Sequence, residues 1–182
     1  MLDQYVIVKA IQKITSQPSK SFSVREFASS AGISPGAAGS ALDYMKKKGI
    51  TTLKIIGRTY QYRANLESPL CRQWKILFNL DMIEESKIAE NLSTHVNNIY
   101  SILLYGSFAH GTNDERSDID ILVITHKPAK PDPKFIKNLG REANLTIMPL
   151  SDWKRKAAVD KVFYENVIYD SIVLYGKRPV VL

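Results

Sequence analysis

The chain has 182 residues, of which 45% are hydrophobic and 24% are charged, and these proportions are typical of a globular protein with one ordinary domain or two small ones. No stretch is long and apolar enough to cross a membrane, and the first residues lack a signal-peptide pattern, so we expect a cytoplasmic protein. Cys71 is the only cysteine, which excludes an intrachain disulfide and a thiolate zinc cluster.

The net charge of +7 is distributed unevenly along the chain. Residues 1–64 contain ten lysines and arginines but three acids, whereas residues 65–182 contain fifteen of each kind. The whole excess therefore lies in the first third. This asymmetry predicts two domains, the first with a polyanion as its partner. A basic surface that is merely solvated would have the same composition.

The first two predicted elements are helices. Residues 2–15 carry apolar side chains four positions apart, along one stripe of a helix. Ser23 and Glu26 then have the spacing of a capping box, in which each side chain satisfies a backbone N–H of the other residue. A second helix is therefore predicted to begin at this point.

A third helix and a hairpin follow. Ser34 is a suitable N-cap, Pro35 suits the first helical position, and Gly49 suits the end of the helix. Residues 51–64 then alternate in polarity on both sides of Gly57-Arg58, a pair that suits a two-residue turn. These features predict a helix followed by a β-hairpin.

Three helices followed by a hairpin resemble a winged helix-turn-helix domain over residues 2–64. The resemblance implies that the helix beginning at Ser34 enters the major groove of duplex DNA, where Ser34 and Ser40 can hydrogen-bond. The cations placed to contact phosphates are Lys46, Lys47, Lys48 and Arg58. Winged helices also mediate protein interaction and dimerisation, so this alternative stays open.

Residues 65–95 are predicted to form a connecting helix. Its apolar side chains recur at intervals of three and four, at Leu70, Trp74, Leu77, Leu80 and Ile83. We expect this stripe to pack in the core and between domains, although it would also suit the seam of a homodimer. His95, near the end of this segment, is expected at the surface rather than as a metal ligand.

Two acids stand at the start of a strand that is otherwise apolar. Residues 118–124 have the sequence DIDILVI, and alternation along a strand points Asp118 and Asp120 to the same side. Two neighbouring carboxylates in a poorly solvated place repel each other, and one of them should resist ionisation. A divalent cation such as Mg²⁺ removes this repulsion, because it takes hard oxygen ligands.

The preceding predicted strand, residues 98–106, ends at Gly106 and is followed directly by Ser107. Gly106 lets the backbone come close to a ligand, and free N–H groups at the helix start expected after Ser107 attract phosphate. Phosphate at Gly106 and Ser107, with a cation at the two aspartates, would together hold a nucleoside triphosphate.

These residues, at this spacing, resemble the signature of the nucleotidyltransferase superfamily, in particular its minimal members. The signature consists of Gly106-Ser107, ten residues, and Asp118-Ile119-Asp120, between two buried strands. The resemblance extends from about residue 99 to the last strand. It implies Mg²⁺ at Asp118 and Asp120 and the transfer of a nucleoside monophosphate from a nucleoside triphosphate (NTP), which we expect to be ATP.

The predicted fold class is therefore α/β (α+β), with a mixed sheet flanked by helices in the second domain. The predicted domains are residues 1–64 (winged helix-turn-helix), 65–95 (connecting helix) and 96–182 (minimal nucleotidyltransferase-like).

The sequence departs from the superfamily pattern in two places. Active members use a third carboxylate on a later strand, which corresponds here to residues 143–150, but the residues on one face of that strand are Asn144, Thr146 and Met148. Asp152 and Asp160 lie further along, in an expected turn and helix. The second departure is His110, at a position where minimal members generally carry arginine.

Three hypotheses follow. The first is an enzyme that transfers a nucleoside monophosphate. The second is a DNA-binding transcriptional regulator whose transferase domain is weak or inactive and acts as a nucleotide sensor or docking module. The third is one component of a toxin–antitoxin pair, since minimal transferases often act with a partner protein.

Overall fold

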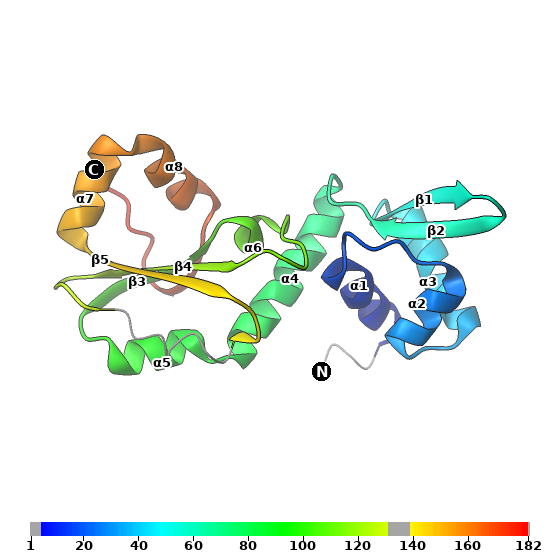
Figure 1. The fold of residues 1–182 in the computed structure, drawn as a ribbon. Helices are drawn as coiled ribbons and strands as arrows, with labels where there is room; N and C mark the ends of the chain where they lie inside the picture. Colours follow the sequence, from blue (N-terminus) through cyan, green and yellow to red (C-terminus); the bar gives the residue numbers. More distant parts are fainter. Residues whose placement is uncertain (1–4, 131–138, 182) are drawn as a thin grey trace. The chain divides into compact units, whose positions relative to one another are not determined.

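The structure is a computed structural model that describes residues 5–130 and 139–181 (Figure 1). The chain divides into two compact units, residues 1–78 with 114–116 and residues 79–113 with 117–182. The domain boundaries predicted at residues 64 and 95 stay predictions. Within the described ranges, no helix has the length and apolar content needed to span a bilayer.

The N-terminal unit contains three helices and a hairpin in the predicted order. The elements are α1 (Val6–Ser16), α2 (Val24–Ala31), α3 (Pro35–Lys47), β1 (Thr51–Ile56) and β2 (Thr59–Ala64). Leu2, at the start of the predicted first helix, lies outside the described residues. The two strands are antiparallel and join through the predicted turn at Gly57-Arg58, with Ile56 opposite Thr59.

The helix N-caps predicted at Ser23 and Ser34 are formed by side-chain hydrogen bonds. Ser23 Oγ accepts a hydrogen bond from Glu26 N at 3.3 Å, and Glu26 Oε2 accepts one from Ser23 N at 2.8 Å. Ser34 Oγ accepts from Ala37 N at 3.2 Å, with Pro35 as the first residue of α3. Both caps satisfy backbone donors that a helix leaves free.

The core of this unit is apolar and closely packed. Ile14, Phe22, Phe27 and Leu42 are fully buried, and the rings of Phe22 and Phe27 meet edge to face with their centroids 5.6 Å apart. Phe22 and Tyr62 exchange two backbone hydrogen bonds, of 2.8 and 2.9 Å. The hairpin is therefore tied to the segment before α2 by backbone as well as by side chains.

The predicted connecting helix is two helices. These are α4 (Pro69–Glu85) and α5 (Ile88–His95), and the prediction of one continuous helix is wrong. Lys87 adopts φ +54°, which interrupts helical geometry. Ser86 stabilises the break, because its hydroxyl donates to Ile83 O at 2.6 Å and accepts from Ile88 N at 3.3 Å.

The apolar stripe of α4 is only partly buried. Leu70 and Leu77 are 42% and 43% exposed, and the buried side chains of the helix include Cys71, Lys75 and Asn79. The polar residues tolerate burial because they are hydrogen-bonded. Lys75 Nζ donates to Thr15 O at 2.8 Å, close to the C-terminal end of α1, where a cation complements the helix dipole.

The C-terminal unit is built on a four-stranded mixed sheet with the order β5-β4-β3-β6. Its further elements are β3 (Ile99–Tyr105), α6 (Ser107–His110), β4 (Ile119–Thr125), β5 (Ala143–Pro149), α7 (Leu150–Val159), α8 (Lys161–Asp170) and β6 (Ile172–Gly176). Strands β4 and β5 are parallel, and the other two pairs are antiparallel. The predicted α/β fold class with a mixed sheet is confirmed.

Both faces of this sheet are covered by helices. On one face, Ile102 and Val123 pack in a core that includes Leu92 of α5. On the other face, Leu122 packs with Trp153 of α7 and Val167 of α8. Figure 1 shows α5 on one side of the strands and α7 with α8 on the other. Because both faces are covered, the central strands are apolar almost throughout, and a polar side chain on them is conspicuous.

Candidate functional site

Three polar side chains form a row across the sheet. Tyr105 at the end of β3 pairs with Asp120 on β4, and Asp120 pairs with Asn144 on β5. Alternation along β4 places Asp120 on the same face as Leu122, which is the face covered by α7 and α8. Tyr105 also packs against the apolar cluster of that face, so the row lies where this cluster meets the polar end of β4.

Gly106 lies directly against the Asp120 carboxylate. It adopts φ +70° and ψ −153°, a conformation open almost solely to glycine. A Cβ atom built on Gly106 would lie 2.5 Å from Asp120 Oδ2. Both the backbone angle and the lack of a side chain are therefore needed for strand β3 to turn into α6 beside this carboxylate.

Asp118 lies immediately before β4. The backbone N–H of the next residue, Ile119, donates to Glu142 O at 3.0 Å, which extends the pairing of β4 with the segment before β5. Ile119 is fully buried, whereas Asp118 and Asp120 on either side of it are half-buried. The prediction that the two aspartates point to the same side stays a prediction.

The position expected for a third carboxylate holds an amide. Asn144 Nδ2 donates to Asp120 Oδ1 at 3.1 Å. Within residues 5–130 and 139–181, no three His, Cys, Asp or Glu side chains gather in a group that could hold a metal. The two half-buried carboxylates of Asp118 and Asp120 nevertheless fit one hard cation such as Mg²⁺, which commonly takes one or two carboxylates together with phosphate oxygens.

Asp152 and Asp160 make other contacts. Asp152 forms an ion pair with Arg155 at 3.2 Å. Asp160 forms one with Lys156 at 2.8 Å and accepts from Phe163 N at the start of α8. The Lys156 hydrogen bond, followed by that of Phe163 N, lowers the pKa of Asp160 below its usual value. Both acids therefore make their contacts within α7 and at the start of α8.

Tyr105 brings a phenol close to the aspartates. Burial raises the pKa of Tyr105 above its usual range, and the negative charge of Asp120 raises it further. Its ring meets Phe163 edge to face, with centroids 5.8 Å apart. Tyr105 is thus a neutral, packed neighbour of Asp120 at neutral pH.

A buried pair of amides supports the segment between Gly106 and the aspartates. Asn79 Nδ2 donates to Asn113 Oδ1 at 3.0 Å and to Phe108 O at 2.8 Å, and Asn113 Nδ2 donates back to Asn79 Oδ1 at 3.4 Å. Both side chains are almost fully buried. Sequence reasoning missed this pair, because its partners are 34 positions apart and neither residue belongs to a recognisable motif.

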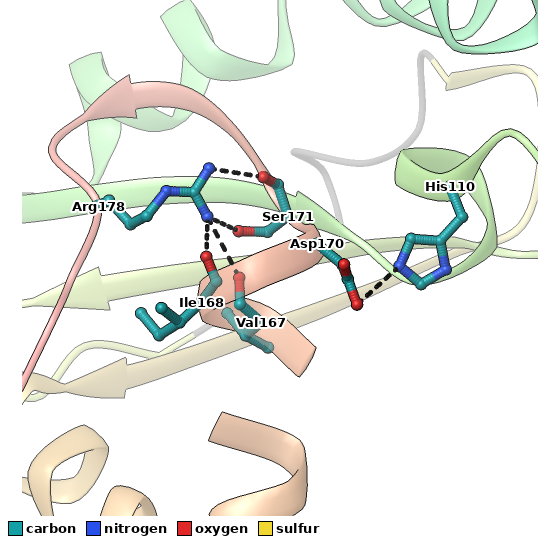
Figure 2. A network of polar contacts seen from close by, with 6 residues as sticks. All are labelled: His110, Val167, Ile168, Asp170, Ser171 and Arg178. Atoms are coloured by element: carbon teal, nitrogen blue, oxygen red, sulfur yellow. Dashed lines mark hydrogen bonds and ion pairs between the residues drawn. The ribbon is translucent and has the colours of Figure 1, made fainter. Parts of the chain in front are cut away.

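His110, the second departure from the superfamily pattern, lies close to the end of α8. His110 Nε2 lies 3.6 Å from Asp170 Oδ2 at the end of α8, and both side chains are substantially exposed. Figure 2 shows this contact beside a second one, in which Arg178 folds over the end of α8. Arg178 donates to Val167 O and Ile168 O and to the hydroxyl and carbonyl oxygens of Ser171. Its cation therefore complements the C-terminal end of a helix dipole.

The residues predicted to contact DNA lie on α3 and the hairpin. Ser40, Lys46, Lys47, Lys48 and Arg58 are exposed. The exposed Ser34 uses its hydroxyl oxygen to cap α3, which leaves its hydroxyl hydrogen to donate. Tyr44 is also 46% exposed on α3, and Lys48 Nζ lies 5.9 Å from its ring centroid.

Comparison with known proteins identifies the family of the C-terminal region. The family model described as polymerase beta nucleotidyltransferase matches residues 86–179. The chain belongs to this nucleotidyltransferase family. The matched residues include Gly106, Ser107, Asp118, Asp120 and Asn144. No curated protein matches the chain significantly.

Solved structures similar to this chain were also found. One is a toxin–antitoxin crystal structure with AMP-PNP, at 25% identity and TM-score 0.41, which covers 52% of this chain and 74% of that chain. A protein from Sulfolobus solfataricus, described as a nucleotidyltransferase, has 14% identity and TM-score 0.37, with 58% and 87% covered. TrmBL2, an archaeal chromatin protein that binds DNA, has 14% identity and TM-score 0.28, with 89% and 70% covered.

Proposed function

We propose that the chain binds an NTP with Mg²⁺ and transfers a nucleoside monophosphate from it, with ATP as the nucleotide. The observation that carries this proposal is the Asp120 carboxylate held against Gly106 at the turn from β3 into α6. The family assignment supports it, because the match includes both residues. In this proposal, Asp118 and Asp120 are the metal-binding and catalytic residues, and Gly106 and Ser107 approach the phosphates.

In the proposed reaction, a hydroxyl oxygen of the acceptor forms a bond to the α-phosphorus. The bond from that phosphorus to the pyrophosphate oxygen breaks, pyrophosphate leaves, and the hydroxyl proton passes to water. A cation at the aspartates would supply charge neutralisation at the phosphates. Gly106, which lacks a side chain, lets the Asp120 carboxylate lie directly against the turn into α6.

Calorimetric titration tests the nucleotide site. ATP, GTP, CTP and UTP are titrated into the wild type and into the double variant Asp118→Ala/Asp120→Ala, with and without Mg²⁺. We expect Mg²⁺-dependent binding, strongest for ATP, and its loss in the double variant by about 2–5 kcal/mol, which is a factor of at least about 30 in Kd. Equal binding by a folded double variant would refute the site, and transfer of label from [α-³²P]ATP would establish the reaction.

A second proposed function is binding of duplex DNA by residues 1–64, as a winged helix-turn-helix domain. It is supported by the exposed cations of α3 and of the hairpin turn, and by the +7 excess carried in this part of the sequence. Joined to a transferase domain of low activity, such a domain would make the protein a transcriptional regulator that senses a nucleotide.

Fluorescence anisotropy with labelled duplex DNA tests this second function on the full chain. We expect an affinity that falls steeply as salt rises, since cations on the protein replace condensed counterions on the DNA. If no binding occurs at 50 mM salt, the DNA-binding proposal fails. If DNA binding is found together with nucleotide binding but without label transfer, the regulator is favoured over the enzyme.

A further inference from the structure

The contact between Asn144 and Asp120 determines how many cations the site can hold. The two residues are direct neighbours across the parallel pair β4 and β5. Asn144 Nδ2 lies 3.1 Å from Asp120 Oδ1, while Asp120 Oδ2 faces Gly106. One oxygen of this carboxylate is thus engaged with a neighbouring strand, and the other lies at the turn into α6.

The chemistry of the two groups fixes the direction of this hydrogen bond. An ionised carboxylate only accepts hydrogen bonds, so the amide must present its NH₂ group to it. A carboxylate at position 144 would instead place a second negative charge beside Asp120, and a cation between the two groups would relieve their repulsion. The hydrogen bond from the Asn144 amide therefore stabilises the Asp120 carboxylate without a cation.

The remaining ligands are sufficient for one cation. Asp118 and Asp120 are the two carboxylates of the proposed site, and Asp120 Oδ2 lies against Gly106 before the start of α6, where the phosphates of a nucleotide would approach. A second cation, about 3.5–4 Å from the first in two-metal sites, needs carboxylate oxygens of its own. Asp120 Oδ1 is engaged by Asn144, and in the described part of the chain no third His, Cys, Asp or Glu joins the pair.

We propose that this site takes one divalent cation with one nucleoside triphosphate, and that Asn144 is the positioning residue that excludes a second cation. This inference rests on the nucleotide site proposed above and goes beyond it. It describes a protein that binds cation and nucleotide together but transfers the nucleotide slowly, because neither a second cation nor a third carboxylate activates the acceptor.

Counting bound Mn²⁺ by electron paramagnetic resonance tests the proposal, with a non-hydrolysable ATP analogue at saturation. We expect about one Mn²⁺ per chain in the wild type and about two in Asn144→Asp, because the new carboxylate replaces a donor by an anionic acceptor beside Asp120. Asn97→Asp is the matched control. It makes the same amide-to-acid change at an exposed residue before the opposite end of β3, and it should keep the count at one.

Thermal unfolding of the same variants provides a second measurement. Without a cation, Asn144→Asp should melt below the wild type, since two carboxylates then face each other. Mn²⁺ should raise its Tm by more than it raises the Tm of the wild type or of Asn97→Asp. Label transfer from ATP by Asn144→Asp should rise at least about tenfold above that of the wild type.

The outcomes separate this inference from the nucleotide proposal on which it rests. Two Mn²⁺ ions in the wild type, or a count of one in a folded Asn144→Asp that binds the analogue, would overturn the single-cation inference and leave the nucleotide site standing. Failure of the wild type to bind the analogue at any Mn²⁺ concentration would overturn both.

Discussion

The two units carry their functional groups in different ways. In the C-terminal unit, a few polar side chains lie at one end of a sheet that is otherwise apolar and covered on both faces. In the N-terminal unit, the cations are exposed on a helix and a hairpin turn. Polar side chains are few on the central strands of this sheet, and a row of them at one end of the strands therefore indicates a candidate site. Exposed charge indicates only the class of partner.

The sharpest test of the site at the end of the sheet is Gly106→Ala. The substitution adds a methyl group 2.5 Å from Asp120 Oδ2 at a backbone of φ +70°, so we expect Asp120 to be displaced. Stability should fall by about 1–3 kcal/mol, and Mg²⁺-dependent ATP binding should weaken at least about tenfold by calorimetry.

Gly57→Ala is the matched control for this change. Gly57 has φ +61° with nothing within 4 Å of the added methyl group, so it carries the backbone strain without the crowding. Its ATP binding should equal that of the wild type. If the two variants lose the same stability and both bind ATP normally, the close approach of Gly106 to Asp120 has no functional importance.

Removing the buried amide pair of Asn79 and Asn113 should have the next largest effect on stability and ATP binding. Asn79→Ala leaves Phe108 O and the Asn113 amide without their buried partner, which should cost about 1–3 kcal/mol of stability. ATP affinity should fall as well, since the pair holds the segment that follows Gly106. Denaturant unfolding and calorimetry measure the two effects. Asn166→Ala, at an exposed position of α8, should change neither, and an unchanged Asn79→Ala would show that the pair is dispensable.

The exposed charges of the N-terminal unit should contribute in small, additive steps. Lys46→Ala/Lys47→Ala should reduce the slope of log K against log salt by about 2, because each phosphate contact contributes about 0.9. Anisotropy titrations at several salt concentrations measure this slope. Lys127→Ala/Lys130→Ala removes two exposed lysines of the other unit. An equal reduction in that control would mean that DNA binding responds to net charge and has no defined surface in residues 1–64.

The smallest expected effect concerns pH. Burial, and then the charge of Asp43, raise the pKa of Tyr62 above its usual 10.0. The folded state therefore favours the protonated phenol. This contribution to stability is complete below pH 10 and is lost as the pH rises through the raised pKa of the folded protein.

Tyr62→Phe should accordingly lose about 0.5–1.5 kcal/mol at neutral pH, together with the hydrogen bond of 3.2 Å to Asp43. Above pH 10 its stability should decline less than that of the wild type, as followed by thermal unfolding between pH 7 and 11. Tyr60→Phe, exposed on the same strand, is the control. A parallel decline in wild type and Tyr62→Phe would show that another group causes the alkaline loss.

Much of the fold could be predicted because its signals are local. The caps at Ser23 and Ser34 depend on residues within one turn, and the hairpin depends on the two residues of its turn. The strands around Gly106 and Asp120 were recognisable because a long apolar run with a polar interruption is rare in a solvated loop. The caps and the hairpin turn each depend on residues a few positions apart, and the Gly106-Ser107 and Asp118-Ile119-Asp120 motifs are each contiguous in the sequence.

The features that could not be predicted depend on contacts between distant residues. Lys87 breaks the expected connecting helix at φ +54°, and nothing in its immediate sequence requires this angle. Leu77 belongs to the predicted apolar stripe but is exposed, whereas Asn79 is buried. Asn79 can be buried because it hydrogen-bonds to Phe108 O. The sequence contains Asn144 on the predicted strand, but only the register of β4 and β5 places it beside Asp120.

Cys71 makes the opening of one unit measurable by chemistry. It is fully buried in the core of the N-terminal unit, and burial raises the pKa of its thiol above the usual value, so alkylating reagents reach a reactive thiolate only when the surrounding structure opens. Because it is the single cysteine of the sequence, its alkylation can be measured without mutagenesis. Its alkylation rate would report how often the N-terminal core opens, and whether DNA slows that opening.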